Sequence, residues 1–272
     1  MYKLICIDLD GTLLDTRQRV STKNREAIRK ALDQGIEVAI VSGRPNCFTI
    51  RIMNQISGRM GHITFNGAYY RIANKTRQFP IPKEAVMKVA KLAQKYHVRT
   101  YFKNKNLSLC TKSDPGILDY DQFKSQTPLK DQMDMLYNVD VVDVLSNQDI
   151  NILKIFAWDE NLENVRKMRE ELKEIEGINL YLYDENFEMS SEDTSKGKAI
   201  QNVCADLGIQ LDEVVCIGDN YNDLSMFEVA GLSVAMENAP RKIKEMVDKV
   251  TLTNDESGVA YAIENFVLKE NE

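Results

Sequence analysis

The stretch that decides the fold is Lys3-Leu4-Ile5-Cys6-Ile7-Asp8-Leu9-Asp10-Gly11-Thr12. Its first half is a continuous apolar run, which is typical of a strand buried on both faces in a parallel sheet. Its second half places two aspartates and a glycine directly after that strand. Sites in open parallel sheets form beyond the carboxyl ends of the strands. The stretch therefore predicts an α/β fold with acidic groups at the functional edge of its sheet.

Strands and helices alternate in the first and last thirds of the chain. A helix is expected to begin near Ser21 or Thr22 and to end at Gly35, and the strand Ile36–Val41 follows it. In the last third, the helix Lys196–Leu207 precedes the strand Val214–Ile217. This order implies right-handed crossovers, and it predicts a Rossmann-like parallel-sheet core formed by residues 1–82 and 189–272.

The middle of the chain has a different pattern. It begins at Pro80-Ile81-Pro82, where two prolines interrupt any regular element. We interpret residues 83–188 as a second α/β domain inserted into the first. A charged helix is expected at Leu162–Leu172, and the stretch from Ser113 to Gln148 has no pattern that assigns it. The expected strands are Val98–Phe102, Leu107–Thr111, Ile152–Ala157 and Ile178–Leu182.

Three polar clusters each follow an apolar strand, and they are Asp8–Thr12, Ser42-Gly43-Arg44 and Gly218–Asp223. Taken singly, each has an ordinary reading as a turn, a loop or a helix N-cap. Taken together, they would gather four carboxylates at one sheet edge: Asp8, Asp10, Asp219 and Asp223. Such carboxylates repel one another strongly unless a cation lies between them. Oxygen ligands and an anionic substrate favour Mg²⁺ as that cation.

The bulk composition is that of an ordinary globular protein, with 272 residues of which 43% are apolar and 28% charged. The formal net charge of −6 disfavours nucleic acid as a partner. No apolar run approaches the roughly 20 residues that cross a bilayer, and the N-terminus does not resemble a signal peptide. Five scattered cysteines are expected to be buried free thiols in a reducing cytoplasm. A zinc site is improbable, because only two histidines could assist these cysteines.

In its motifs the sequence resembles the haloacid dehalogenase superfamily of phosphatases, and within it the Cof-type hydrolases of subclass IIB, which carry a large α/β cap. The resemblance covers both halves of the predicted core, and the predicted cap contributes almost nothing to it. The residues that carry it are Asp8-Leu9-Asp10-Gly11-Thr12-Leu13-Leu14, Ser42-Gly43-Arg44-Pro45, Asn66-Gly67-Ala68, Ser195-Lys196-Gly197, Gly218-Asp219-Asn220-Tyr221-Asn222-Asp223 and Asn254 to Ala260.

The resemblance implies a role for each aspartate. Asp8 is expected to be the nucleophile that forms an aspartyl-phosphate, and Asp10 the general acid and base. Because alternate residues of a strand share a face, the side chains of Asp8 and Asp10 are expected to point to the same side. The expected metal ligands are the side chains of Asp8 and Asp219 and the backbone carbonyl of Asp10. Asp223 is expected to support the metal through its neighbours, with a direct bond as the alternative.

The resemblance also implies phosphate contacts from Ser42, from the amides of Gly43 and Leu9, and from Asn222. Lys196 is expected to place its positive charge against the equatorial phosphoryl oxygens. Taken alone, Lys196 reads as a solvated lysine at a helix start. Its surroundings do not form a Walker A loop, because the earlier glycine is missing and Ala199 replaces the Ser or Thr.

Two other classes of function share part of this pattern. A phosphotransferase or phosphomutase would use the same aspartyl-phosphate. A non-catalytic phospho-ligand-binding protein, such as a receiver domain, would also cluster aspartates around Mg²⁺, but receivers are about half this length and lack an inserted cap. The sequence does not choose among sugar phosphates, flavin mononucleotide, pyridoxal phosphate and erythrose phosphate as substrates. It also leaves the oligomeric state open.

Overall fold

The computed structural model describes residues 1–113 and 127–269. They form two compact units. The first contains Met1–Arg44, Thr49–Arg77 and the chain from Ser195 onwards, and the second contains Pro45–Phe48 and Gln78–Thr194. The expected limits of an inserted domain, residues 83 and 188, stay a prediction. In the described part of the chain, no helix is both long and apolar enough to cross a membrane.

An eight-stranded sheet forms the centre of the first unit. From β14 across to β3 all neighbours are parallel, and β4 runs antiparallel to β3. The expected α/β fold with a parallel sheet is therefore confirmed. In sheet order the strands are β14 (Lys249–Val250), β13 (Leu232–Ala235), β12 (Val214–Gly218), β1 (Leu4–Asp8), β2 (Glu37–Val41), β3 (Gly61–Thr64), β4 (Tyr69–Ile72) and β5 (Lys75–Gln78).

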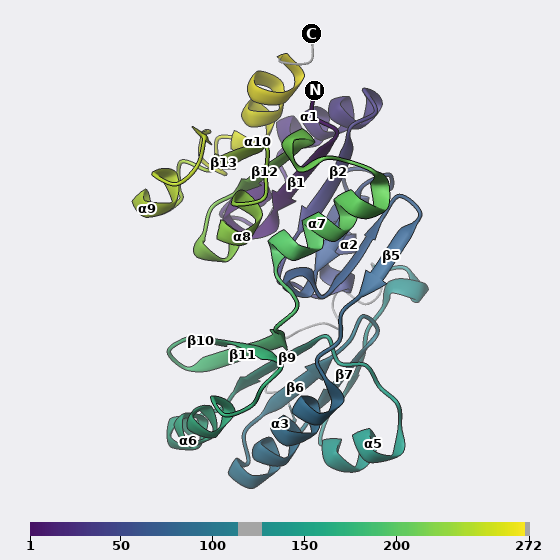
Figure 1. The fold of residues 1–272 in the computed structure, drawn as a ribbon, viewed down its shortest axis with the longest axis vertical. Helices are drawn as coiled ribbons and strands as arrows, with labels where there is room; N and C mark the ends of the chain where they lie inside the picture. The colour runs from purple at the N-terminus through teal and green to yellow at the C-terminus, as the bar shows by residue number, and fades with distance from the viewer. Residues whose placement is uncertain (114–126, 270–272) are drawn as a thin grey trace. The chain divides into compact units, whose positions relative to one another are not determined.

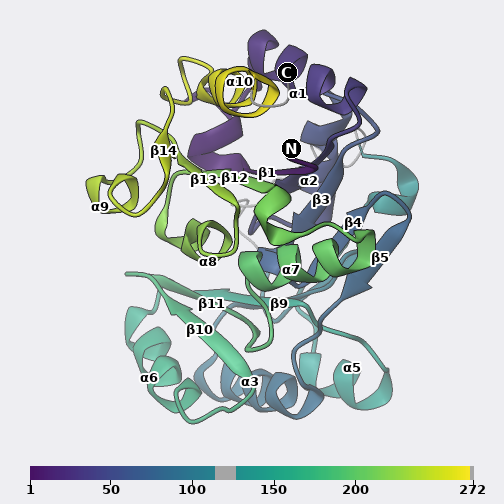
Figure 2. The same ribbon diagram turned by 45° about the horizontal axis from the view of Figure 1, so that its top comes forward.

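Helices cover both faces of this sheet (Figure 2). On one face, α1 and α10 pack on apolar side chains such as Ile7, Ile40 and Ile217. On the other face lie α7 and α8, which contact each other. Ser21 caps α1 by accepting a 3.1 Å hydrogen bond from the Asn24 amide, close to the expected helix start. The helices are α1 (Thr22–Asp33), α2 (Asn46–Asn54), α7 (Lys196–Leu207), α8 (Leu224–Phe227), α9 (Arg241–Lys244) and α10 (Gly258–Ala262).

The second unit is built on a six-stranded, mostly antiparallel sheet. Its helices α3 (Lys83–Tyr96), α5 (Val141–Asn147) and α6 (Leu162–Leu172) lie on one side of it (Figure 1). The four strands expected here are all present, and β8 and β11 add two that the sequence pattern missed. Part of the unassigned stretch after Ser113 lies outside the described residues. In sheet order the strands are β10 (Ile178–Leu182), β11 (Asn186–Ser191), β9 (Lys154–Trp158), β6 (Thr100–Lys103), β7 (Leu107–Cys110) and β8 (Asp134–Leu136).

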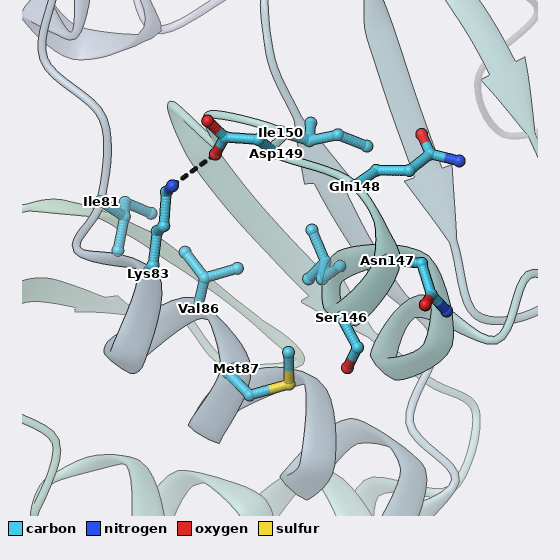
Figure 3. Close-up of a pocket in the computed structure, with 10 residues that line it drawn as sticks. Ile81, Lys83, Val86, Met87, Ser146, Asn147, Gln148, Asp149 and Ile150 are labelled. Carbon is cyan, nitrogen blue, oxygen red and sulfur yellow. Dashed lines mark ion pairs between the residues drawn. The ribbon is translucent and has the colours of Figure 1, made fainter.

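A cavity of about 300 Å³ opens between the start of α3 and the end of α5 in this unit (Figure 3). Val86 and Met87 line it from α3, and the segment 145–150 lines it from α5 and the loop after it. At its rim Lys83 forms an ion pair with Asp149. The charges at the rim therefore already satisfy each other.

His62 in β3 makes folding of the first unit sensitive to acid. Both ring nitrogens are buried and lack a hydrogen-bond partner among the described residues. Burial, assisted by the charge of Arg71, lowers the pKa of the imidazole from 6.5 to about 3. The unfolded chain therefore binds the proton first as pH falls. The stability that neutral His62 contributes is present above pH 6.5 and is lost between pH 6.5 and 3.

We expect His62 alone to make the unfolding free energy at pH 5 about 2 kcal/mol lower than at pH 7.5. Between these pH values the imidazole gains a proton in the unfolded chain, while in the folded protein it stays neutral. Urea unfolding of the His62→Phe variant should show a shallower pH dependence by that amount. The control is His97→Asn, which replaces the exposed second histidine with a residue that tolerates its left-handed backbone. If His62→Phe keeps the wild-type pH dependence while remaining folded, the assignment to His62 is wrong.

Candidate active site

The end of β1 and the end of β12 bring an acidic cluster together. Asp8 is the last residue of β1, and Asp219 follows β12 directly. Ile7 pairs with Ile217 in the parallel ladder, so the two aspartates emerge at the same sheet edge. Asp223 follows in the next turn, and one carboxylate oxygen from each of the three lies within 4.8 Å of the others. The structure therefore brings together three of the four aspartates that the sequence singled out.

Lys196 lies buried against this cluster at the first position of α7. Its Nζ donates to Asp8 Oδ1 at 2.5 Å and to Asp223 Oδ1 at 2.6 Å. Only 1% of its side chain is exposed, which rules out the reading as a solvated helix-start lysine. Burial lowers the pKa of Lys196, but the charges of Asp8 and Asp223 more than offset this and hold it above its usual value. Lys196 is therefore a permanent cation at this site.

The carboxylates carry more negative charge than Lys196 neutralises. Burial raises the pKa of Asp8 to about 8 even though Lys196 opposes the rise. Burial also raises the pKa of Asp219 to about 6, against a hydrogen bond from the Thr12 hydroxyl. Charged Asp8 and Asp219 thus lack compensation, and a divalent cation with oxygen ligands would supply it. On the chemistry of its donor groups, the cluster fits such a metal.

Both oxygens of Asp223 are already engaged. Oδ1 accepts from Lys196, and Oδ2 accepts from the amides of Asp219 at 2.9 Å and Asn220 at 3.0 Å. These bonds hold the loop after β12 and orient Asp219. Asn222 lies exposed in the same turn, next to Asp223.

Asp10 lies apart from the group formed by Asp8, Asp219 and Asp223. Its carboxylate is bound by the guanidinium of Arg44, with Nε donating to Oδ2 at 2.8 Å and a second N–H donating to Oδ1. The strand argument that placed Asp10 on the same side as Asp8 does not apply, because β1 ends at Asp8 and the chain turns at Leu9. Arg44 was part of a recognised motif, but the sequence did not indicate its partner.

Gly11 allows this turn to approach the loop after β12. Its φ is +77°, and a Cβ there would lie 2.5 Å from Asp219 Oδ2. Next to it, Thr12 donates to Asp219 Oδ1 at 2.8 Å, a contact that sequence reasoning missed. Gly11 and Thr12 therefore position Asp219.

Ser42 and Gly43 follow β2, which neighbours β1. Ser42 is buried, and its hydroxyl accepts from the Arg44 amide at 3.1 Å. Gly43 lies so close to Asn66 that a Cβ would be 2.7 Å from its Oδ1. Leu9, whose amide was expected to contact phosphate, is fully buried at the start of the turn.

Asn66-Gly67, which alone reads as a simple turn, lies against the start of α7. A Cβ at Gly67 would meet the Ser195 carbonyl oxygen at 2.2 Å, so glycine allows this turn to pack against the start of α7.

Comparison with known proteins decides the family. The model of haloacid dehalogenase-like hydrolases matches residues 5–263. The chain belongs to this family. Among its relatives, phosphatase YwpJ of Bacillus subtilis is 30% identical over 97% of this chain and 100% of its own length. The 5-amino-6-(5-phospho-D-ribitylamino)uracil phosphatase YwtE of the same organism is 31% identical over 97% of this chain and 98% of its own.

Solved structures of other proteins have the same fold. TM0651 from Thermotoga maritima superposes with a TM-score of 0.83 at 29% identity, covering 97% of both chains. The subclass IIB sugar phosphatase BT4131 superposes with a TM-score of 0.74 at 25% identity, covering 97% of this chain and 98% of its own. The expected haloacid dehalogenase family, Cof-type subclass and fold are therefore confirmed. The chain is an enzyme, a phosphatase of the haloacid dehalogenase type.

Proposed function

We propose that this phosphatase hydrolyses small phosphorylated metabolites with Mg²⁺ as cofactor, through an aspartyl-phosphate on Asp8. The observation that carries the proposal is the buried cluster of Asp8, Asp219 and Asp223 around Lys196, with one carboxylate oxygen of each aspartate within 4.8 Å of the others. It provides a nucleophile, a fixed positive charge and oxygen ligands at one sheet edge.

Two displacements at phosphorus account for the reaction. In the first, an Asp8 carboxylate oxygen bonds to phosphorus, the ester P–O bond breaks, and Asp10 gives a proton to the leaving oxygen. In the second, Asp10 takes a proton from water, the water oxygen bonds to phosphorus, and the Asp8–phosphorus bond breaks to release inorganic phosphate. Arg44 orients the Asp10 carboxylate, and we assign it a positioning role.

The remaining groups hold the phosphoryl oxygens and the metal. Ser42, Asn222 and the amides of Leu9 and Gly43 would donate hydrogen bonds to phosphate, and Lys196 would offset its charge. The side chains of Asp8 and Asp219 and the carbonyl of Asp10 would hold Mg²⁺. The metal would supply positive charge to the reacting phosphate. Because Asp223 already accepts three hydrogen bonds, we propose that it supports the metal through Asp219 and not by a direct bond.

A phosphorylated sugar or sugar-like compound is the substrate class we propose. The relative YwtE is named for a phosphoribitylamino compound, and BT4131 is named a sugar phosphatase. We propose residues 83–188 as the substrate-specificity domain, since the groups around Asp8 serve only the phosphate. We also propose that the enzyme acts in the cytoplasm, where its five free cysteines would stay reduced.

We expect hydrolysis of 4-nitrophenyl phosphate to require Mg²⁺. EDTA should abolish phosphate release and added Mg²⁺ should restore it, while Ca²⁺ should substitute poorly because it takes more ligands at longer distances. Run in ¹⁸O-water, the reaction should release phosphate that carries one solvent oxygen. Unlabelled ester as the main product would favour a phosphotransferase or phosphomutase. Full activity in EDTA with metal content verified as nil would exclude the metal.

A further inference from the structure

The sheet of the second unit carries buried polar side chains on the face opposite its helices, among aromatic ones such as Tyr101. Phe102, Ile155 and Phe187 belong to the apolar core that packs under α3 and α6. Because successive strand residues point to opposite faces, their neighbours Lys103 and Lys154 project from the other face. Buried lysines in the middle of a sheet are rare unless something pairs with them.

Four buried polar residues form one row across this face. Lys103 and Lys154 are direct partners in the antiparallel β6–β9 ladder, and Ser108 pairs with Lys103 from β7. In β11, Met189 pairs with Ile155, which places Ser190 beside Lys154. Their exposed fractions are 6% for Lys103, 7% for Lys154, 0% for Ser108 and 2% for Ser190. We call these four residues the Lys103–Lys154 row.

Two lysines lie side by side in the row, and Lys103 has no carboxylate partner among the described residues. Like charges directly opposite each other on paired strands are destabilising. Lys154 has a carboxylate partner, Glu188, at 2.7 Å. Lys103 Nζ lies 5.0 Å above the Tyr101 ring, and no described carboxylate lies within ion-pair distance of it. Burial and then Lys154 lower the pKa of Lys103 to about 8, although Glu188, Cys47 and Cys110 oppose them.

The two serines of the row have unused hydroxyl groups. Ser108 Oγ and Ser190 Oγ are buried and have no hydrogen-bond partner among the described residues. Leaving a buried hydroxyl unpaired costs about 1–3 kcal/mol. A ligand with several acceptor oxygens would accept from Lys103 and from Ser108, its direct partner on β7. Ser190 lies three strands away from Ser108, beside Lys154, and cannot reach the same oxyanion group. The same ligand would supply a negative charge next to Lys103.

We infer that the Lys103–Lys154 row is an oxyanion-binding site that takes a carboxylate or phosphate group. The anion has two conceivable sources with the same chemistry. It is either a second anionic group on the substrate, which rests on the function proposed above, or a separate small anion that binds the enzyme on its own. Lys103 and Ser108 supply the hydrogen bonds, and Lys154 adds charge.

The first arm of the test compares 3-phosphoglycerate with glycerol 3-phosphate, which lacks the carboxylate. If the substrate supplies the anion, the wild type should prefer 3-phosphoglycerate, and the ratio of the two kcat/KM values should fall about 10- to 100-fold in Lys103→Met, the effect of losing a hydrogen bond to a charged group. Ser108→Ala should lower the ratio about 3- to 10-fold, as for a neutral hydrogen bond. Lys105→Met, an exposed lysine in the same hairpin, is the matched control and should leave the ratio unchanged.

The second arm measures malonate binding by calorimetry, which needs no turnover. Malonate binding that is lost in Lys103→Met and kept in Lys105→Met, with no change in the kinetic ratio, would identify a separate anion as the ligand. Thermal unfolding verifies that each variant is folded. If neither the ratio nor malonate binding depends on Lys103, the oxyanion site is refuted. Phosphate release from 4-nitrophenyl phosphate by the same wild-type preparation tests the proposed hydrolase function separately.

Discussion

Asp8→Asn is expected to lower kcat by at least ~10³-fold, which corresponds to roughly 4 kcal/mol in the activation barrier. Asparagine keeps the shape of the side chain and can still contact Lys196, but its amide is too weak a nucleophile to attack phosphorus. Steady-state kinetics with 4-nitrophenyl phosphate measures the loss. Asp33→Asn is the matched control, because Asp33 is exposed and pairs only with the exposed Arg59 at 2.6 Å among the described residues.

Asp10→Ala should fail at a different step and so separates the two roles. With an activated leaving group that needs little protonation, the first displacement should survive while attack by water slows. A phosphoenzyme should then accumulate. Acid-quenched protein should gain the mass of one phosphoryl group, and peptide mapping should place that group between Leu4 and Arg17. A fully active Asp8→Asn enzyme, or a phosphoryl group mapped elsewhere, would end the assignment of Asp8 as nucleophile.

Lys196→Met should damage both catalysis and folding. Lys196 is the shared partner of Asp8 and Asp223, and all three side chains are buried. Removing one partner of a buried ion pair typically destabilises a protein by about 3–5 kcal/mol, because the remaining charge is left uncompensated. The loss of its charge from the phosphate site should also lower kcat by ~10²–10³-fold.

Urea unfolding in EDTA measures the stability part of this prediction without a contribution from bound metal. Lys198→Met is the control, since Lys198 lies on the exposed side of the same helical turn, and it should change stability by no more than about 0.5 kcal/mol. If Lys196→Met retains wild-type stability and turnover, the ion pairs of Lys196 with Asp8 and Asp223 contribute neither to folding nor to catalysis.

Local pattern was sufficient to predict most of the secondary structure. The apolar runs at β1 and β12 identified buried strands, and the helix predicted at Lys196–Leu207 has the bounds of α7 in the structure. β11 was missed although its residues alternate between polar and apolar. β11 spans residue 188, which was predicted as the end of the inserted domain. The short elements β8 and α9 offer too few residues for periodicity to be detected.

The candidate site was predicted in part, for a reason that concerns sheet topology. Asp8 and Asp219 each end a strand, and parallel neighbours carry such residues to one edge, so their meeting followed from the strand pattern. The position of the Asp10 side chain did not follow, because the residues after Asp8 leave the strand. Its binding by Arg44 depends on how two loops approach each other.

By itself, the sequence determined which polar residues follow which buried strands. From that pattern came the family, the fold and the expected nucleophile. Only the tertiary structure decided which charges are buried together. Lys196 reads as an ordinary surface lysine until α7 places it between residues 188 positions earlier and 27 positions later. Lys103 likewise acquires its significance only when the β6–β9 register sets it opposite Lys154. Local periodicity encodes which face of a helix or strand a residue occupies, whereas its burial and its partner depend on strand order and register, which join distant parts of the chain.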